Sequence, residues 1–325
     1  MSQIAFVFPG QGSQFVGMGK ALAESSPAAA AVFAAADAAL GEPISKLAWE
    51  GPEEDLNRTE NSQPALLACS IAYLEAVKER WYELQVDIPE PAFAAGHSMG
   101  QYTALVAAGA LSLEDAVRLV RIRGQRMHAS GTGREGRMAA VIGLDDANLP
   151  ELVRQGSEHG VFGIANRNSP GQVVMSGERA AVEASLAIAK TLGARRAIEL
   201  PVSVAAHSPL MAEAAEGMRE VLASIPFHDP EPPLLANADA RVITTAEGCR
   251  AELVDHLTTG VDWVGAIRAM EAAGVTTFIE IGPGQVLTGL IKRIAPGATV
   301  IALDDKAAAD RLNIPFAESA AEPTA

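Results

Sequence analysis

The chain has 325 residues, of which 49% are hydrophobic, so it can bury a sizeable core in one large domain or in a large and a small one. Its 25 basic and 40 acidic side chains give a net charge of -15, which disfavours nucleic acid and anionic membrane surfaces as partners because both require a basic face. The two cysteines stand in no metal-ligand spacing, so we expect two reduced thiols in a cytoplasmic protein without a metal or redox cofactor.

The first predicted element is a strand at residues 4–8, a continuous apolar run typical of a strand buried on both faces. No basic residue precedes this run, so we expect a strand rather than a signal peptide. No stretch approaches the roughly 20 apolar residues of a membrane helix. Residues 92–95 and 276–281 are similar runs, each followed by glycine and a helical pattern. This alternation predicts a parallel sheet with helices on its faces.

The middle of the chain has a different order of elements. Strands are expected at 138–144, 161–165, 172–176 and 196–202, and helices at 147–158 and 180–192. Residues 166–171, between the second and third of these strands, have the composition of a turn. The resulting βαββαβ order is that of a ferredoxin-like unit.

The predicted domain boundaries follow from this order. The glycine-rich segment before residue 137 has the composition of a linker, so we place a small subdomain at residues 134–204. It is inserted into a larger core formed by residues 1–133 and 205–305. Residues 306–325 are rich in Ala, Glu and Pro, and we expect a disordered tail there.

A serine stands at the centre of a Gly-x-Ser-x-Gly motif at residues 96–100, between a predicted strand and a predicted helix. In enzymes this motif holds the serine on a sharp turn, so that its hydroxyl projects from the sheet edge. The helix that follows directs N–H groups and a positive dipole end at the reacting centre. The sequence therefore predicts Ser98 as a nucleophile; a glycine-rich turn with an incidental serine is the alternative.

A serine of ordinary pKa needs a base, and His207 is the candidate among the six histidines. It follows an apolar segment and directly precedes Ser-Pro, a signal for the start of a helix, so we expect it beside the sheet edge. A capping or packing histidine fits this local pattern equally well. His97 is expected to point away from the Ser98 hydroxyl, and His256 is expected to be a partly exposed helix residue. The remaining histidines fit solvated positions: His128, His159 and His228.

The loop after the first strand, Pro-Gly-Gln-Gly-Ser-Gln at residues 9–14, has glycines that allow close backbone approach. We expect the backbone N–H groups of Gln11 and Met99 to stabilise an oxyanion. The alternative is a phosphate-binding loop. Its spacing fails, because Phe15 stands at the last glycine position of GxGxxG and Met18 at the lysine position of GxxxxGK.

Arg123 is the most informative charged residue. A helix begins near Ser112 with a capping pattern to Asp115, and Arg123 falls in the middle of its apolar arc. A guanidinium on an inward face must be paired. The periodicity leaves two partners open: an internal carboxylate in a structural salt bridge, or a substrate carboxylate held by the guanidinium fork.

Together these motifs resemble the malonyl-CoA:acyl carrier protein transacylase family, which includes the acyltransferase domains of polyketide synthases. The resemblance runs from residues 8–14 to the Gly-Pro-Gly of residues 282–284. Between them it takes in Gly-His-Ser-Met-Gly, the pair Arg123-Gly124, and most of residues 164–174 and 201–208.

The resemblance implies an α/β-hydrolase-like parallel-sheet core with an inserted ferredoxin-like subdomain. It implies transfer of malonyl from malonyl-CoA to the phosphopantetheine thiol of an acyl carrier protein, for fatty-acid or polyketide synthesis, by a cytoplasmic monomer. No cofactor is expected beyond the coenzyme A thioester substrate. It implies Ser98 as the nucleophile, His207 as the base and Arg123 as the clamp for the malonyl carboxylate. It also implies Gln11 and Met99 as the oxyanion donors and Asn166 as a residue near the acyl cleft.

Several positions depart from the family. His256 and Gly260 stand where the family usually has Gln and Pro, and that Gln orients the catalytic histidine. If its backbone carbonyl orients the histidine, His256 is harmless; if its side chain does, the orientation of His207 changes. Residues 204–207, Val-Ala-Ala-His, match neither pattern often linked to malonyl or methylmalonyl choice, so the sequence leaves that choice open.

Two other functions compete with the transacylase. A thioesterase or acyl hydrolase on the same Ser-His pair usually supplies an acid between the two in chain order, but Asp145 and Asp146 lie in the predicted insert. A neutral ester also gives Arg123 no purpose. A non-catalytic carrier-binding module needs no such set of residues. A carrier surface would be locally basic, and Arg195-Arg196 and Lys292-Arg293 are the nearest candidates.

Overall fold

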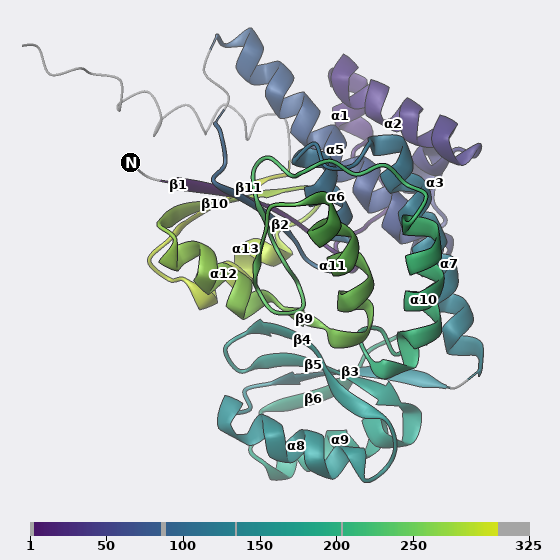
Figure 1. Cartoon of the computed structure of the whole chain (residues 1–325), viewed down its shortest axis with the longest axis vertical. Helices are drawn as coiled ribbons and strands as arrows, with labels where there is room; N and C mark the ends of the chain where they lie inside the picture. The colour runs from purple at the N-terminus through teal and green to yellow at the C-terminus, as the bar shows by residue number, and fades with distance from the viewer. Residues whose placement is uncertain (1–2, 86–88, 134, 203, 305–325) are drawn as a thin grey trace, which may run out of the picture.

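A six-stranded sheet forms the centre of the larger part of the molecule, in the order β11-β10-β1-β2-β7-β8 (Figure 1). The first five strands of this order run parallel and β8 pairs antiparallel at the edge. The strands are β1 (Gln3–Phe8), β2 (Phe93–Gly96), β7 (Leu234–Leu235), β8 (Val242–Ile243), β10 (Val275–Ile281) and β11 (Thr299–Leu303). The strands predicted at 4–8, 92–95 and 276–281 thus agree within one residue at each end. The computed structural model describes residues 3–85, 89–133, 135–202 and 204–304, so the tail predicted at 306–325 lies outside the described residues.

Helices cover both faces of this sheet, as its doubly buried strands require. One face packs against a large core cluster with the long helix α5 (Thr59–Glu83), which is buried along most of its length. The other face packs against α12 (Trp263–Ala272) and α13 (Val286–Ile294). The remaining helices are α1 (Lys20–Ser25), α2 (Pro27–Leu40), α3 (Ile44–Glu50), α4 (Glu53–Leu56), α6 (Gly100–Ala107), α7 (Leu113–Gly133), α10 (Ala212–Leu222) and α11 (Ala246–Thr259).

The smaller part has its own five-stranded sheet, in the order β6-β3-β5-β4-β9. Its elements are β3 (Gly136–Ile142), α8 (Leu149–Ser157), β4 (Phe162–Ser169), β5 (Gln172–Glu178), α9 (Arg179–Thr191) and β6 (Arg196–Glu199). One face packs on α8 and α9, which lie farthest from the larger part in Figure 1. The βαββαβ order predicted from the sequence is therefore present. The fifth strand, β9 (Val261–Asp262), comes from the larger part and pairs parallel with β4, so the two parts share a sheet.

Two local expectations were wrong. Residues 166–169 were expected in a turn but continue β4, and only Pro170 and Gly171 turn the chain. The reason is tertiary, because Asn166 pairs with Val174 on one side and with Val261 of β9 on the other. Pairing on both sides overrides turn composition, and irregular register on either side of these residues absorbs the mismatch. The last small-domain strand also ends at Glu199 instead of Val202.

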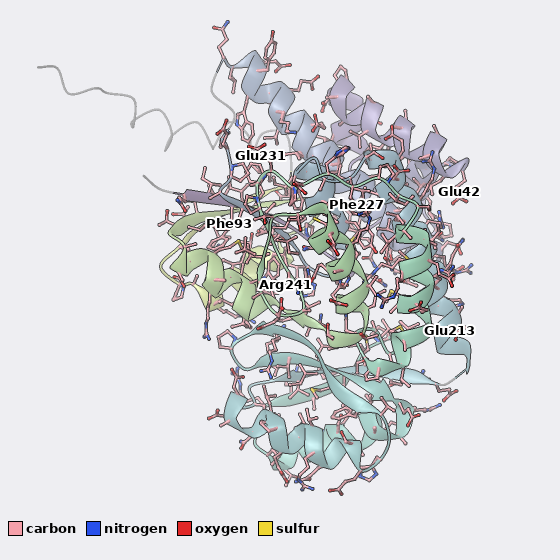
Figure 2. The ribbon with its side chains drawn as sticks, viewed as in Figure 1. Glu42, Phe93, Glu213, Phe227, Glu231 and Arg241 are labelled. Carbon is pink, nitrogen blue, oxygen red and sulfur yellow. The ribbon has the colours of Figure 1, made fainter. Side chains whose placement is uncertain are left out.

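The side chains follow this division between core and surface (Figure 2). The charged residues Glu42 and Glu213 lie exposed at the edge of the molecule, while Phe227 is buried and its ring lies beneath the Arg250 guanidinium, 4.9 Å away. Within the described ranges, none of the helices combines the length and the apolarity needed to cross a membrane.

Candidate active site

Ser98 stands on a tight turn between β2, which ends at Gly96, and α6, which begins at Gly100. Its backbone φ of 53° lies in the left-handed region that residues other than glycine rarely adopt. Glycine is required on both sides of the turn: a Cβ on Gly96 would lie 1.9 Å from the Gly100 carbonyl carbon, and one on Gly100 would lie 2.4 Å from the Phe8 carbonyl oxygen. The predicted strand–turn–helix setting is therefore present, and it projects Ser98 from the carboxyl edge of the sheet.

His207 lies against Ser98, with its Nε2 2.8 Å from the Ser98 Oγ. Its Nδ1 lies 2.7 Å from the backbone carbonyl oxygen of His256. A carbonyl can only accept, so Nδ1 carries the proton and Nε2 is free to take one from the hydroxyl. Burial and the nearby Arg123 lower the pKa of His207 to about 3, against the opposing effect of the His256 carbonyl. The imidazole is therefore neutral near pH 7, as a general base must be.

His256 was expected to be partly exposed, and this prediction was wrong. The side chain is fully buried, with Nδ1 2.8 Å from the Glu252 carbonyl oxygen and Nε2 3.3 Å from Arg123 Nη2. The burial arises because α11 is covered by α10, α6 and the turn after His207, none of which is visible in the local pattern of α11. Burial, reinforced by the charge of Arg123, lowers the pKa of His256 well below its ordinary value.

Arg123 is only 1% exposed and extends from α7 toward Ser98 and His256. Its Nη1 donates to Gln63 Oε1 at 2.7 Å, and its Nη2 lies 3.2 Å from the Ser98 Oγ. Among the described residues, no carboxylate forms an ion pair with Arg123, and its Nε has no acceptor. The internal salt bridge left open by the sequence is therefore absent from this part of the chain. A buried cation in this state has an unmet need for an anion, which a ligand can supply.

The two expected oxyanion donors flank Ser98. The Gln11 loop packs against the serine turn, because a Cβ on Gly10 would lie 2.4 Å from the His97 carbonyl oxygen. The Gln11 side chain accepts from Thr59 Oγ1 at 2.9 Å, which fixes the loop. Over the ranges that the structure describes, neither the Gln11 nor the Met99 backbone N–H has a hydrogen-bond acceptor. Both are therefore free to bind an oxygen on a substrate.

A cavity of about 540 Å³ joins these residues at the junction of the two parts. Gln11, Ser98, Arg123 and His207 line it from the larger part, and Asn166 lines it from β4. Met99 is buried beside it and His256 lies behind Arg123. Eight further lining residues are apolar: Met127, Met138, Val174, Leu200, Pro201, Val202, Val204 and Ala206. The lining is completed by Gly12 and four polar residues: Gln14, Asn57, His97 and Asn168. The arrangement suits an acyl group with one anionic end.

Sequence reasoning missed three polar residues around the site. Gln63 anchors Arg123, Asn168 Oδ1 lies 2.8 Å from His97 Nε2, and Asn237 Oδ1 accepts from the Ser98 N–H at 2.8 Å. Gln63 carried no usable signal, because it follows four polar residues, Thr-Glu-Asn-Ser, at the start of α5 and its partner Arg123 is 60 positions away. Asn237 carried none, because its partner is 139 positions away.

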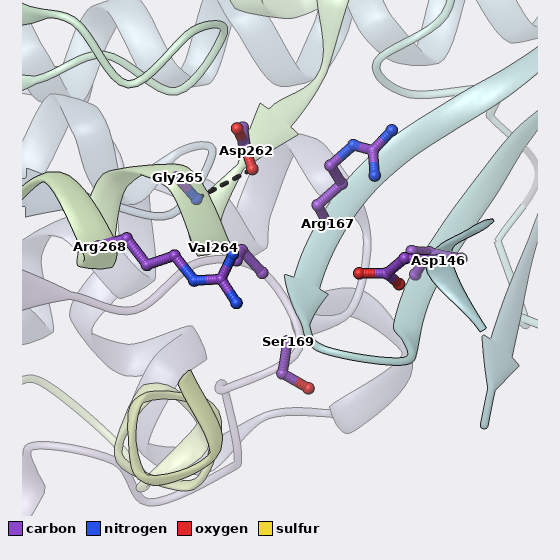
Figure 3. A pocket seen from close by; sticks show the side chains of 8 residues that line it. Asp146, Arg167, Ser169, Asp262, Val264, Gly265 and Arg268 are labelled. Atoms are coloured by element: carbon purple, nitrogen blue, oxygen red, sulfur yellow. Dashed lines mark hydrogen bonds between the residues drawn. The ribbon is translucent and has the colours of Figure 1, made fainter. Parts of the chain in front are cut away.

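A second cavity of about 250 Å³ lies between the end of β4 and the start of α12 (Figure 3). Arg167 and Ser169 line it from β4. One carboxylate oxygen of Asp262 accepts a hydrogen bond from the N–H of Gly265 in α12. Its lining contains no histidine or cysteine and none of the predicted site residues. It therefore lacks the serine–histidine pair of the larger cavity.

Comparison with known proteins agrees with this geometry. The family model of the acyl transferase domain matches residues 5–302. A malonyl CoA-acyl carrier protein transacylase of Bacillus subtilis (strain 168) is 46% identical over 94% of this chain and 94% of its own. That of Escherichia coli (strain K12) is 44% identical over 95% of this chain and 98% of its own. This chain belongs to the malonyl CoA-acyl carrier protein transacylase family.

Solved structures of malonyl CoA-acyl carrier protein transacylases share the fold. An acyl carrier protein S-malonyltransferase of Vibrio cholerae has a TM-score of 0.90 and 41% identity, covering 96% of this chain and 100% of that one. A transacylase of Coxiella burnetii has a TM-score of 0.91 and 38% identity, covering 96% of each chain. A malonyl-transacylase in complex with a type II PKS acyl-carrier protein has a TM-score of 0.88 and 40% identity, covering 95% of this chain and 98% of that one. The predicted fold class is thereby confirmed.

Proposed function

We propose that the chain transfers a malonyl group from malonyl-CoA to the phosphopantetheine thiol of an acyl carrier protein, through a malonyl ester on Ser98. The observation that carries the proposal is the buried Arg123, which has no carboxylate partner among the described residues and lies 3.2 Å from the Ser98 Oγ through Nη2. A cation beside a nucleophile selects an acyl group that carries its own carboxylate.

The first half-reaction acylates Ser98. His207 Nε2 accepts the hydroxyl proton as the Ser98 Oγ attacks the thioester carbonyl. The oxyanion of the tetrahedral intermediate accepts hydrogen bonds from the free backbone N–H groups of Gln11 and Met99. Collapse of the intermediate breaks the carbon–sulfur bond, and the coenzyme A thiolate leaves with the proton returned by His207. The malonyl carboxylate rests on Arg123, and Asn166 contacts the acyl group from β4.

The second half-reaction transfers the malonyl group onward. The phosphopantetheine thiol of the carrier protein loses its proton to His207 and attacks the malonyl ester. The same two N–H groups hold the second oxyanion, and the Ser98 Oγ leaves with the proton from His207. No step draws on a metal or a redox cofactor.

The hydrolase alternative has less support. An α/β hydrolase aligns its histidine with a carboxylate, whereas the His207 Nδ1 bonds to a backbone carbonyl. Glu252, on α11, contacts a different histidine, because its Oε1 lies 3.9 Å from the Nδ1 of His256. Water as the final acceptor is thus an outcome of the test and not a second proposal.

We also propose that the protein works as a cytoplasmic monomer. Two free, buried cysteines suit a reducing compartment. Ser98, His207 and Arg123 contact one another within one chain, so these contacts need no second copy. Light scattering in solution tests the monomer, and cell fractionation tests the location.

Isotope exchange tests the double-displacement mechanism. The enzyme is mixed with malonyl-CoA and labelled coenzyme A, without any carrier protein. If a malonyl-enzyme forms, we expect the label to enter malonyl-CoA. We also expect parallel initial-velocity lines when the concentrations of both substrates are varied. Exchange that requires the carrier protein, together with intersecting lines, would contradict the covalent intermediate.

A further inference from the structure

The side chain of Asn237 spans the serine turn. Its Oδ1 accepts from the Ser98 N–H at 2.8 Å, and its Nδ2 donates to the Gly96 carbonyl oxygen at 2.9 Å. An N–H can only donate and a carbonyl can only accept, so the amide has one orientation that satisfies both. Asn237 is 3% exposed and follows β7, the strand beside β2. It therefore clamps both ends of the turn that presents the proposed nucleophile.

The backbone of Asn237 is itself fixed from two directions. Its N–H donates to Glu252 Oε1 at 2.5 Å, and its carbonyl oxygen accepts from the Asp262 N–H at 2.6 Å. Glu252 is 1% exposed on α11, and Asp262 belongs to β9. The amide that clamps the turn is therefore preorganised and not free to follow Ser98.

The helix that anchors Asn237 also holds the proposed base. Glu252 and His256 are one turn apart on α11, and the His256 Nδ1 donates to the Glu252 carbonyl. The His256 carbonyl in turn accepts from His207 Nδ1, and His207 Nε2 meets the Ser98 Oγ. These contacts connect the Ser98 backbone to the Ser98 hydroxyl through α11. This one helix therefore positions both Ser98 and His207.

We propose that Asn237 is a positioning residue for Ser98, with Glu252 as its anchor. This inference deepens the function proposed above and rests on it. The left-handed backbone of Ser98 persists only where its surroundings over-determine it, and Asn237 supplies two of the hydrogen bonds that do so. Asn237 does not line the cavity, so it acts on the reaction only through the turn.

A positioning role predicts a particular kinetic pattern. The binding of malonyl-CoA depends on Arg123 and on the side chains of the cavity wall, and Asn237 reaches this wall only through the backbone N–H of Ser98. Acylation depends on the placement of the Ser98 Oγ and the Met99 N–H, which are both set by the turn. Loss of Asn237 should therefore lower kcat and leave KM nearly unchanged, whereas a general structural defect lowers the amount of folded enzyme.

The experiment compares Asn237→Ala and Asn237→Asp with wild type. Asn237→Ala removes both hydrogen bonds; Asn237→Asp keeps the volume and one acceptor but sets an oxygen against the Gly96 carbonyl. The matched control is Asn148→Ala, which removes an amide that donates to the Leu192 carbonyl at 3.1 Å in the small part. Three quantities are measured: kcat and KM for malonyl-CoA, the rate at which phenylmethylsulfonyl fluoride labels Ser98, and Tm.

We expect Asn237→Ala to lower kcat about 10²-fold, the size of effect that a misplaced reacting group produces. KM for malonyl-CoA should stay within about threefold of wild type, and Ser98 labelling should slow by a factor similar to that for kcat. Asn237→Asp should lose activity in the same direction, and Asn148→Ala should retain both rates.

Wild-type kcat and labelling in a folded Asn237→Ala enzyme would overturn the inference. If that variant does not fold, Asn237→Asp decides in the same way. A loss confined to KM would also overturn it, because the residue would then act on binding. Labelling by the sulfonyl fluoride needs no malonyl-CoA, so it still tests Asn237 if wild type proves unable to transfer malonyl. The two proposals can therefore fail separately.

Discussion

His256 holds His207 through its backbone: its carbonyl oxygen lies 2.7 Å from His207 Nδ1. Its side chain turns the other way and presents Nε2 to Arg123 Nη2 at 3.3 Å. One residue thus contacts the proposed base and the proposed clamp with different groups. The glutamine that the family usually has here can offer the same carbonyl, so the departure at this position leaves the orientation of His207 intact.

The side chain of His256 should matter for substrate binding and not for the chemical step. His256→Leu removes the acceptor beside Arg123 but keeps the carbonyl on His207. We expect KM for malonyl-CoA to rise about tenfold, in line with the loss of a hydrogen bond to a charged group, with kcat nearly unchanged. His256→Gln restores an acceptor and should recover most of the loss. His159→Leu, at an exposed histidine, is the control. A large fall in kcat for both His256 variants would instead assign the side chain to the base.

Arg123 should decide which acyl groups are accepted. Arg123→Ala removes a buried cation, so we expect kcat/KM for malonyl-CoA to fall roughly 10²–10³-fold. The same quantity for acetyl-CoA, which has no carboxylate, should hold or rise. Arg118→Ala removes an exposed arginine of the same helix, paired with Asp115, and should change neither value. Equal losses for both substrates in Arg123→Ala would show that the arginine supports the fold and not selection.

His207 should stay active as a base in mild acid. Burial and Arg123 lower its pKa to about 3, so the neutral form persists well below the ordinary histidine pKa of 6.5. We expect the rate of coenzyme A release in the first half-reaction to stay level from pH 8 to about pH 5 and to fall only as the pH approaches the lowered value. Removing the positive charge in Arg123→Ala should move the fall to higher pH. A wild-type inflection near pH 6.5 would contradict the lowered pKa.

The glycines of the serine turn should be irreplaceable. In Gly100→Ala the new Cβ would lie 2.4 Å from the Phe8 carbonyl oxygen and 2.8 Å from that of Pro9. These are backbone atoms, so we expect the free energy of unfolding to fall by about 1–3 kcal/mol, together with loss of activity. Gly289→Ala is the matched control, because a Cβ there meets nothing within 4 Å on an exposed position of α13. It should raise the free energy of unfolding by about 0.5–1 kcal/mol. Denaturant titration checks both.

Local patterns predicted the parts of this fold that are locally determined. The apolar runs at β1, β2 and β10 gave strands because their residues are buried on both faces, and Arg123 was placed inward by helical periodicity alone. Contacts distant in sequence were out of reach. Residues 166–169 have turn composition, yet pairing with β5 and β9 makes them a strand. His256 looked like a surface residue because the elements that bury it lie elsewhere in the chain.

The same distinction between local patterns and distant contacts applies to the candidate site. Ser98, Gln11 and Arg123 stand in patterns whose chemistry can be read from spacing, and they line one cavity. The residues that hold them could not be found this way. Asn237 and Gln63 meet Ser98 and Arg123 across 139 and 60 positions, respectively, and a single amide side chain carries no periodic signal.

Intact-protein mass after brief incubation with malonyl-CoA tests the central claim most directly, with Ser98→Ala as the control. We expect an adduct of one malonyl group on wild type, none on Ser98→Ala, and its removal when a phosphopantetheine-bearing acyl carrier protein is added. The malonyl group should then appear on the carrier. An adduct that forms without Ser98, or that water removes as fast as the carrier does, would contradict the account.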